Sequence, residues 1–303
     1  MANNSGDLQN MRKLSSPISG DHRLINAMTV DVEDYFQVSA FERSIRPEDW
    51  DRMECRVERN MDRILSLFDA HGVRGTFFML GWLAERYPQL VRRIVDNGHE
   101  LASHGYAHVR VTQQRPDEFR RDVVRTKKLL EDISGRPVRG YRAASYSIGA
   151  DNLWALDILR EVGHDYSSSI YPIVHDLYGW PSAPRFAFHY QETGLLEIPV
   201  TTVTLFNWKF PCGGGGYFRL FPYPVSRWAL RRVNEHDREP CVFYFHPWEI
   251  DAAQPRQRRL SLKSRFRHYL NLDRMEARLI RLFEDFRWGR MDHVFLETSK
   301  TAA

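Results

Sequence analysis

The chain has 303 residues, 43% of them hydrophobic, and a formal net charge of +4 at pH 7. Basic residues alternate with acidic ones along the sequence instead of forming one run, which argues against a nucleic-acid-binding protein. The sequence contains no apolar stretch of about 18 residues, so it predicts no transmembrane helix. The three cysteines, Cys55, Cys212 and Cys241, are odd in number and far apart, so they fit a reducing compartment and indicate no thiolate metal site.

The first 22 residues differ in composition from the rest. They are rich in Ser, Asn, Asp and Gly and lack the apolar centre of a signal peptide. We therefore expect residues 1–22 to be a disordered tail on a cytoplasmic protein. The remainder of the chain is long enough to bury a large core.

Three acidic residues close the first predicted strand. Residues 27–34 begin as a buried strand, and Asp31, Glu33 and Asp34 follow its apolar residues without the Gly, Ser or Pro that is typical of a surface turn. Asp31 and Glu33 share a face if the strand continues, because side chains alternate along a strand. The pattern favours a functional cluster over an exposed turn.

Helices and strands then alternate along the chain. We predict helices over residues 47–70, 83–97, 116–134, 151–163 and 273–286. The Tyr87-Pro88 step is expected to kink the second of these helices or to split off its first turn, and Asp151 is expected to cap the fourth. We predict further strands over residues 73–80, 100–103, 138–142, 165–169, 195–200, 241–246 and 293–297.

Two histidines follow the predicted strand over residues 100–103. His104 and His108 are four residues apart, and Gly105 argues against a regular helix, so we expect a loop that brings both rings toward one point. Neutral imidazoles are good ligands for borderline divalent cations such as zinc. His99, at the other end of the strand, is expected to be a structural residue.

Alternating strands and helices predict a parallel sheet, and this number of units favours closure into a barrel. The acidic cluster, the two histidines, Arg142 and His246 all come at the ends of predicted strands. The carboxyl ends of the strands of a (β/α) barrel form one rim, where these groups would meet. The run over residues 213–216, four glycines, lacks the spacing of a phosphate-binding loop, and both a mobile loop and a substrate-facing loop remain open.

Four stretches carry a resemblance to a known family: TVDVED at residues 29–34, SHGYAH at 103–108, GYRAASY at 140–146 and YFHPWE at 244–249. In this order they resemble the polysaccharide deacetylases of carbohydrate esterase family four, and within them a subgroup associated with exosortase-type exopolysaccharide loci. The resemblance implies an α/β fold, a distorted (β/α) barrel of the polysaccharide deacetylase type. Residues 23–303 would form a single catalytic domain that includes a subgroup-specific region from about residue 170.

The resemblance also implies roles for particular residues. His104 and His108 match the two imidazole ligands of one divalent metal, which is usually zinc. Asp31 matches the general base, Arg142 the residue that orients this base, and His246 the general acid.

The third metal ligand is less clear, because most members have two adjacent Asp where this chain has Asp31-Val-Glu-Asp34. The ligand is expected to be Glu33, which shares a strand face with Asp31, or Asp34, which has the usual residue type. Glu33 is slightly favoured.

The implied activity is metal-dependent N-deacetylation of an N-acetylhexosamine-containing polysaccharide or lipid-linked oligosaccharide in exopolysaccharide biosynthesis, with release of acetate. A non-catalytic saccharide-binding protein on the same fold and a metal hydrolase of small amides are the alternatives. A cytoplasmic enzyme of this kind would meet its substrate at the inner membrane face, so peripheral membrane contact is expected.

Several aromatic side chains could stack on sugar rings, although core packing is the simpler expectation for each: Tyr146, Trp208, Tyr217 and Trp248. Glu249 is expected to pair with an arginine and not to take part in catalysis.

Overall fold

The computed structural model describes six ranges of the chain, residues 11–13, 24–42, 44–175, 178–190, 192–257 and 260–297. Most of the expected disordered tail lies outside these ranges; within it, Met11–Lys13 forms strand β1. Among the helices in the described ranges, none combines the length and the apolar character needed to cross a membrane.

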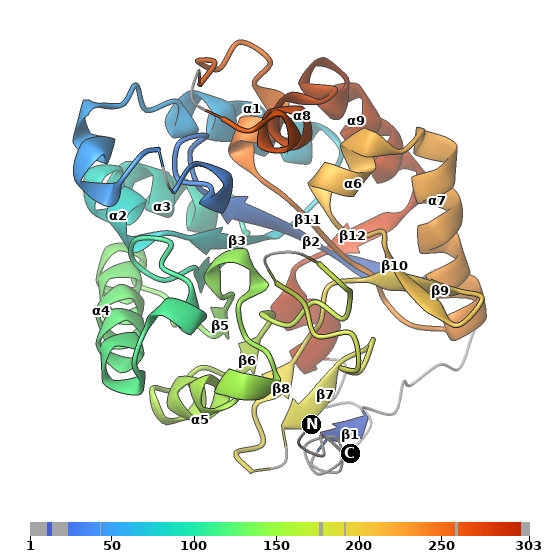
Figure 1. Ribbon diagram of the computed structural model, residues 1–303, viewed down its shortest axis with the longest axis horizontal. Helices are drawn as coiled ribbons and strands as arrows, with labels where there is room; N and C mark the ends of the chain where they lie inside the picture. The colour runs from blue at the N-terminus through green and yellow to red at the C-terminus, as the bar shows by residue number, and fades with distance from the viewer. Residues whose placement is uncertain are drawn as a thin grey trace.

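A curled sheet forms the centre of the molecule (Figure 1). Its parallel strands are, in spatial order, β8 (Leu196–Glu197), β6 (Tyr166–Ser167), β5 (Gly140–Tyr141), β4 (Glu100–Ser103), β3 (Thr76–Met79), β2 (Ile25–Val32) and β11 (Val242–Phe245). Strand β12 (Arg287–Gly289) also pairs with β2, and β7 (Phe188–Tyr190) and β1 extend the β8 edge in antiparallel fashion. The expected α/β class is confirmed, and the sheet curls into a half-barrel.

Helices surround this sheet (Figure 1). They are α1 (Val57–Ala70), α2 (Gly81–Arg86), α3 (Pro88–Asp96), α4 (Pro116–Ser134), α5 (Trp154–Glu161), α6 (Gly215–Leu220), α7 (Tyr223–Arg232), α8 (Leu262–Tyr269) and α9 (Met275–Asp285). Short 3₁₀ helices include η3 (Pro47–Arg52), η6 (Ala150–Asn152) and η8 (Pro247–Ile250). Phe68 packs α1 against the sheet and against α9, because its ring contacts those of Phe77 on β3, Phe245 on β11 and Phe283 on α9.

The first predicted helix is two helices in the structure, η3 and α1. The Asp34 carboxylate accepts hydrogen bonds from the backbone N–H groups of Arg56 at 2.5 Å and Val57 at 2.8 Å, and so starts a new helix there. The expected break at Tyr87-Pro88 is confirmed, since α2 ends at Arg86 and α3 begins at Pro88.

Two further predictions are wrong. Asp151 does not cap a long helix: it lies within η6, where the Asn152 side chain accepts from Gly149 N–H, and α5 starts only at Trp154. The predicted strand over 293–297 is the π-helix η10 (Asp292–Glu297). The N–H of Met291 donates to Thr76 and that of Asp292 to Glu100, and these bonds hold the segment across the amino ends of β3 and β4.

The run of four glycines closes the sheet at the β11 edge. Gly213 N–H donates to Thr201 O, Tyr244 N–H donates to Gly213 O, and Gly214 forms a bridge with Tyr244. A Cβ atom on Gly213 would lie 2.4 Å from the carbonyl oxygen of Val242, so only glycine fits this close approach. The run is therefore a packed segment, which leads from the hairpin of β9 (Thr202–Leu205) and β10 (Trp208–Pro211) into α6.

Candidate active site

The carboxyl ends of β2, β4, β5 and β11 bring the predicted site residues together. These strands end at Val32, Ser103, Tyr141 and Phe245, and the residue that follows each is Glu33, His104, Arg142 and His246. Because the strands are parallel, their ends lie at one rim of the half-barrel, as expected from the sequence.

Glu33, His104 and His108 form the centre of the cluster. Each offers a ligand atom, and these atoms lie within 4.8 Å of one another. The Nε2 atom of His108 is 3.1 Å from Oε2 of Glu33. Burial lowers the pKa of His104 and lowers that of His108 well below its usual value, so both imidazoles are neutral at pH 7.

The chemistry of this donor set fits a divalent metal. The Nδ1 atom of His104 lies 2.8 Å from the carbonyl oxygen of Arg142, which only accepts, so Nδ1 carries the proton and Nε2 is left as a ligand. Oε2 of Glu33 is buried and receives no hydrogen bond from the described residues. One carboxylate and two imidazoles match the ligands of catalytic zinc sites.

The loop that carries both histidines is held from two sides. Gly105 has a φ of 72° and His108 a φ of 53°, so the chain turns sharply between the two rings. The N–H of Tyr106 donates to the Asp122 carboxylate of α4 at 3.1 Å, while the N–H of Gly81, at the start of α2, donates to Gly105 O. Asp122 was not predicted, because 16 residues separate it from Tyr106 along the chain.

Asp34, the other candidate ligand, points away from the histidines. Its carboxylate accepts from the thiol of Cys55 at 3.1 Å and from the N–H of Tyr35 at 2.8 Å, in addition to the two amides at the start of α1. The structure thus brings Glu33, and not Asp34, to His104 and His108.

Asp31 and Arg142 form a buried ion pair beside this cluster. Arg142 NH1 lies 2.6 Å from Asp31 Oδ1, and Arg142 also donates to Thr29 Oγ1 and to Ser168 Oγ. Burial alone would raise the pKa of Asp31, but the Arg142 guanidinium lowers it below its usual value. The other oxygen of Asp31, Oδ2, accepts a 3.4 Å hydrogen bond from the hydroxyl of Tyr146.

His246 lies beside Glu33 and also approaches Asp31, whose Oδ2 atom is 4.0 Å from its Nε2 atom. Its Nε2 atom is 3.3 Å from Glu33 Oε1, and its Nδ1 atom is 2.7 Å from Glu249 Oε1. Burial opposes protonation of this imidazole, but the carboxylates of Glu33 and Glu249 raise its pKa to about 9. The expected pairing of Glu249 with an arginine is confirmed by a 2.7 Å contact with Arg219.

Glu249 also has a role that was not predicted: its carboxylate binds the imidazole of His246. The His-x-x-Glu spacing across η8 is the signal that points to it, because residues three apart in a helical turn face each other. Among the aromatic candidates, Trp248 and Tyr146 are buried next to the cluster, whereas Trp208 is 69% exposed on the β9–β10 hairpin.

Glu33 also contacts Trp248, whose ring stacks on His246. Oε1 of Glu33 accepts a 3.4 Å hydrogen bond from the indole Nε1–H of Trp248. The Trp248 ring stacks on His246 on one side and on His268 on the other, with centroid separations of 5.1 and 4.1 Å. Both the carboxylate and the imidazole are therefore fixed by the same indole.

Two family models match different parts of this chain. Residues 49–167 match a family model described as polysaccharide deacetylase, and residues 168–296 match a domain of unknown function (DUF3473). The first match includes His104, His108 and Arg142, whereas Asp31 and Glu33 precede it.

Two curated relatives match shorter segments. The peptidoglycan-N-acetylglucosamine deacetylase of Bacillus cereus is 36% identical over 73 residues, which are 24% of this chain and 26% of that protein. A peptidoglycan deacetylase-like protein of Gibberella zeae is 32% identical over 110 residues, which are 36% of this chain and 32% of that protein. The chain thus spans about a quarter to a third of the length of these relatives.

Among solved structures, a candidate polysaccharide deacetylase from Mycobacterium smegmatis has the same fold. The TM-score is 0.62 at 19% sequence identity, and the alignment covers 96% of each chain. The expected distorted barrel is thereby confirmed. Residues 49–167 are thus similar in sequence to polysaccharide deacetylases, and the chain shares its fold with a protein described in the same way.

Proposed function

We propose that this protein is a metal-dependent hydrolase that removes acetyl groups from N-acetylhexosamine residues of a saccharide. One observation carries the proposal: a buried Asp31–Arg142 pair and a His246–Glu249 pair accompany the cluster of Glu33, His104 and His108, and His246 Nε2 lies 3.3 Å from Glu33 Oε1 and 4.0 Å from Asp31 Oδ2. Amide hydrolysis needs an activated water, stabilisation of the oxyanion and an acid for the leaving amine. The cluster offers groups for each of these tasks.

Glu33, His104 and His108 are the residues that would hold the metal. When bound, a divalent cation such as zinc supplies polarisation of the acetyl carbonyl and a lower pKa for water. Asp31 accepts a proton from the attacking water in this scheme. Arg142 keeps Asp31 ionised, because its guanidinium lies 2.6 Å from the carboxylate in a buried site.

His246 donates a proton to the sugar nitrogen as the C–N bond breaks. Glu249 binds Nδ1 of this imidazole, so Nε2 is presented to the cluster and carries the proton that is transferred. The products are acetate and a residue with a free amine. His246 has the acid role in this scheme because its pKa, raised to about 9, keeps it protonated at neutral pH, whereas Asp31 is held ionised by Arg142.

The substrate class rests on the relatives. Those named as peptidoglycan and chitooligosaccharide deacetylases support a substrate with N-acetylhexosamine residues. We propose an exopolysaccharide precursor, polymeric or lipid-linked, in the cytoplasm, with zinc as the metal. Residues 23–303 would act as a single catalytic domain, including the region from about residue 170, because His246 of the second half lies 3.3 Å from Glu33 of the first.

The proposal is tested by metal analysis beside acetate release from N-acetylated oligosaccharides. We expect about one metal per chain and acetate release for the wild type, and the loss of both in His104→Ala, which removes one of three ligands. His293→Ala is the matched control, since this histidine is 52% exposed and belongs to η10. A wild type that binds no metal and releases no acetate would refute the proposal and leave the non-catalytic saccharide binder.

A further inference from the structure

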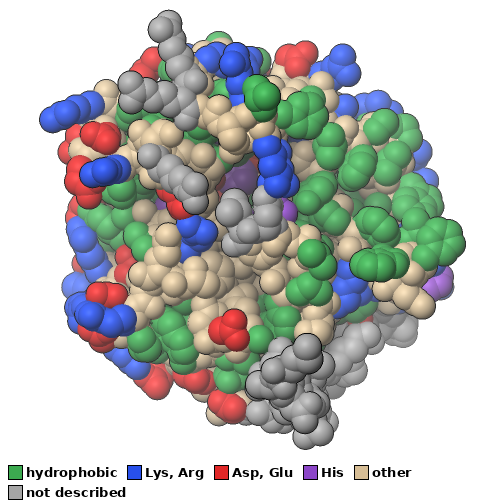
Figure 2. Space-filling model, in the orientation of Figure 1, with side chains coloured by type: hydrophobic (Ala, Val, Ile, Leu, Met, Phe, Trp, Pro, Cys, Tyr) green, Lys and Arg blue, Asp and Glu red, His purple; other side chains and the backbone are tan. Residues whose placement is uncertain are grey.

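A patch of exposed apolar side chains lies on the segment between strands β8 and β11 of the chain. It comes from the β9–β10 hairpin, the end of α6 and the first turns of α7, which packs against β9. We call the following residues, between 40% and 87% exposed, the apolar patch: Phe206, Trp208, Phe210, Leu220, Phe221, Val225 and Trp228. Figure 2 shows hydrophobic side chains gathered on the side where these elements lie in Figure 1. Large exposed apolar patches mark interaction sites.

The β9–β10 hairpin exposes aromatic side chains although its turn has a strained backbone. Phe206 and Asn207, at its tip, have φ angles of 49° and 64°. Turns with two left-handed residues favour Asn and Gly, so a Phe at the first position is strained, and its side chain is 87% exposed as well. Trp208 and Phe210 are two residues apart on β10 and both face solvent. Such rings gain free energy only when a partner covers them.

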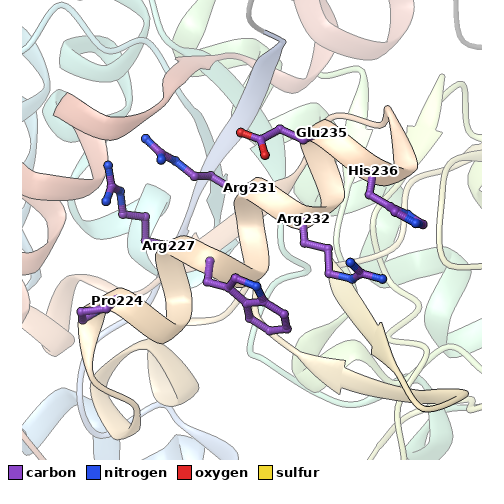
Figure 3. Close-up of a pocket in the computed structure, with 7 residues that line it drawn as sticks. Pro224, Arg227, Arg231, Arg232, Glu235 and His236 are labelled. Atoms are coloured by element: carbon purple, nitrogen blue, oxygen red, sulfur yellow. The ribbon is translucent and has the colours of Figure 1, made fainter.

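Basic side chains flank the apolar patch. A groove of about 350 Å³ runs along α7 and the following turn, and is lined by Pro224, Arg227, Trp228, Arg231, Arg232, Glu235 and His236 (Figure 3). Arg227 lies 2.9 Å and Arg231 3.8 Å from the same carboxylate, that of Asp285. Arg232 has no ion pair with any residue in the described ranges. Three arginines against two carboxylates make this flank positive.

Helix α8, like the apolar patch and its flank, carries exposed apolar side chains next to basic ones. Leu262 is 85% and Phe266 57% exposed, and they are four residues apart, so they share one face of the helix. Lys263, Arg265 and Arg267 alternate with them along α8. Arg219 of α6 donates to backbone carbonyls at the end of α8, which joins the two helices.

Helix α6, which carries Leu220 of the apolar patch at its end, begins beside the candidate active site. Helix α6 starts at Gly215, where a Cβ atom would lie 2.4 Å from the carboxylate of Glu249, the partner of His246. Figure 2 shows histidine atoms in a hollow on the same face as the patch. A surface that covers the patch would therefore lie beside the entrance to the site.

We propose that the apolar patch and its basic flank dock this protein on a bilayer that contains anionic lipids, so that the site meets a saccharide carried by that membrane. Phe, Trp and Leu beside Arg are typical of segments that lie in the membrane interface, where arginines pair with lipid phosphates. A two-fold dimer would set the basic flank against itself. Phe, Leu and Val offer no hydrogen bonds to a polysaccharide. The saccharide part of this inference rests on the proposed function; the lipid binding does not.

The test is cosedimentation of the full chain with vesicles of phosphatidylcholine, with and without phosphatidylglycerol. We expect the wild type to bind the anionic vesicles. The double variant Phe206→Ser, Trp208→Ser should bind them about tenfold or more weakly, because it lacks two rings that would enter the bilayer. The control Val124→Ser changes an exposed apolar residue on α4, outside the apolar patch, and should bind like the wild type. Arg231→Gln with Arg232→Gln should remove the preference for anionic vesicles.

Acetate release from a soluble N-acetylated oligosaccharide separates the two proposals. We expect all these variants to release acetate like the wild type; vesicle binding without any acetate release would refute the proposed function and leave the docking surface standing. A wild type that does not bind anionic vesicles overturns the docking inference, as does a double variant that binds like the wild type. Self-association that the double variant abolishes, or binding to insoluble polysaccharide without binding to vesicles, also overturns it.

Discussion

Glu33 and Asp34 are neighbours in the sequence with opposite surroundings. Strand β2 ends at Val32, and Glu33 N–H donates back to Asp31 O, so the chain turns at this point. Glu33 faces two histidines, and burial raises its pKa to about 7. Asp34 faces three backbone N–H groups and a thiol. One carboxylate is therefore available to a cation, whereas the other is engaged in the fold.

This contrast predicts different outcomes for two isosteric changes. Glu33→Gln should reduce metal affinity by about tenfold or more, because a carboxylate ligand is lost, and leave stability to urea in the metal-free protein unchanged or higher. Asp34→Asn should bind about one metal per chain and lose about 1–2 kcal/mol of unfolding free energy, because a charged acceptor at the start of α1 is lost. Metal analysis and urea unfolding of both variants check this. Metal loss in Asp34→Asn with Glu33→Gln fully loaded would contradict it.

At the scale of elements, the sequence predicted best where local signals decide. Residues 116–134 form α4 with the expected bounds, because Pro116 opens the helix and Gly135, with a φ of 62°, ends it. The strand over residues 100–103 is also as expected. The break before α1 was not predictable, since the carboxylate that causes it, Asp34, is 22 residues away. The same holds for η10, whose backbone is held by Thr76 and Glu100.

The glycines between β10 and α6 show the same dependence on distant contacts. At Gly213 a Cβ atom would meet backbone of β11, whereas at Gly216 it would meet no atom within 4 Å. We expect Gly213→Ala to lower the free energy of unfolding by about 1–3 kcal/mol through overpacking. Gly216→Ala, the control at an exposed position in the first turn of α6, should leave the free energy of unfolding unchanged or raise it by up to about 1 kcal/mol. Urea denaturation measures both, and equal effects of the two changes would contradict the closure of the sheet by Gly213.

For the whole molecule, the position of the candidate site was predictable, whereas the roles of neighbouring residues within it were predictable only in part. Each group follows a strand of a parallel sheet, so strand order did not need to be known for the groups to converge. Strand alternation favoured Glu33 slightly, but the engagement of Asp34 with backbone amides and the contact of Glu249 with His246 depend on side-chain directions at turns, which periodicity does not give. The exposure of Trp208 depends on a hairpin that carries no strong turn signal, since its tip is Phe-Asn.

The amino ends of the strands, opposite the candidate site, are closed around another buried carboxylate. Glu100 on β4 accepts hydrogen bonds from Thr76 on β3, from the hydroxyl of Tyr166 on β6 and from the N–H of Asp292 on η10. Burial and the carboxylate of Asp292 raise its pKa to about 7. The guanidinium groups of Arg139 and Arg290 act on the same carboxylate from outside.

This closure predicts a pH dependence of stability. Because the pKa of Glu100 rises from 4.5 to about 7 on folding, the folded state holds its proton while the unfolded state has lost it. The resulting stabilisation is full below about pH 4.5 and is lost as the pH rises toward 7, by about 2 kcal/mol between about pH 5 and pH 7. Glu100→Gln cannot ionise, so the difference in unfolding free energy between wild type and variant should move by this amount in favour of the variant. Urea unfolding across this pH range, with metal removed from both proteins, measures the difference and cancels the shared contribution of Glu33. Parallel pH profiles for the two proteins would show that Glu100 is not the group that η10 keeps protonated.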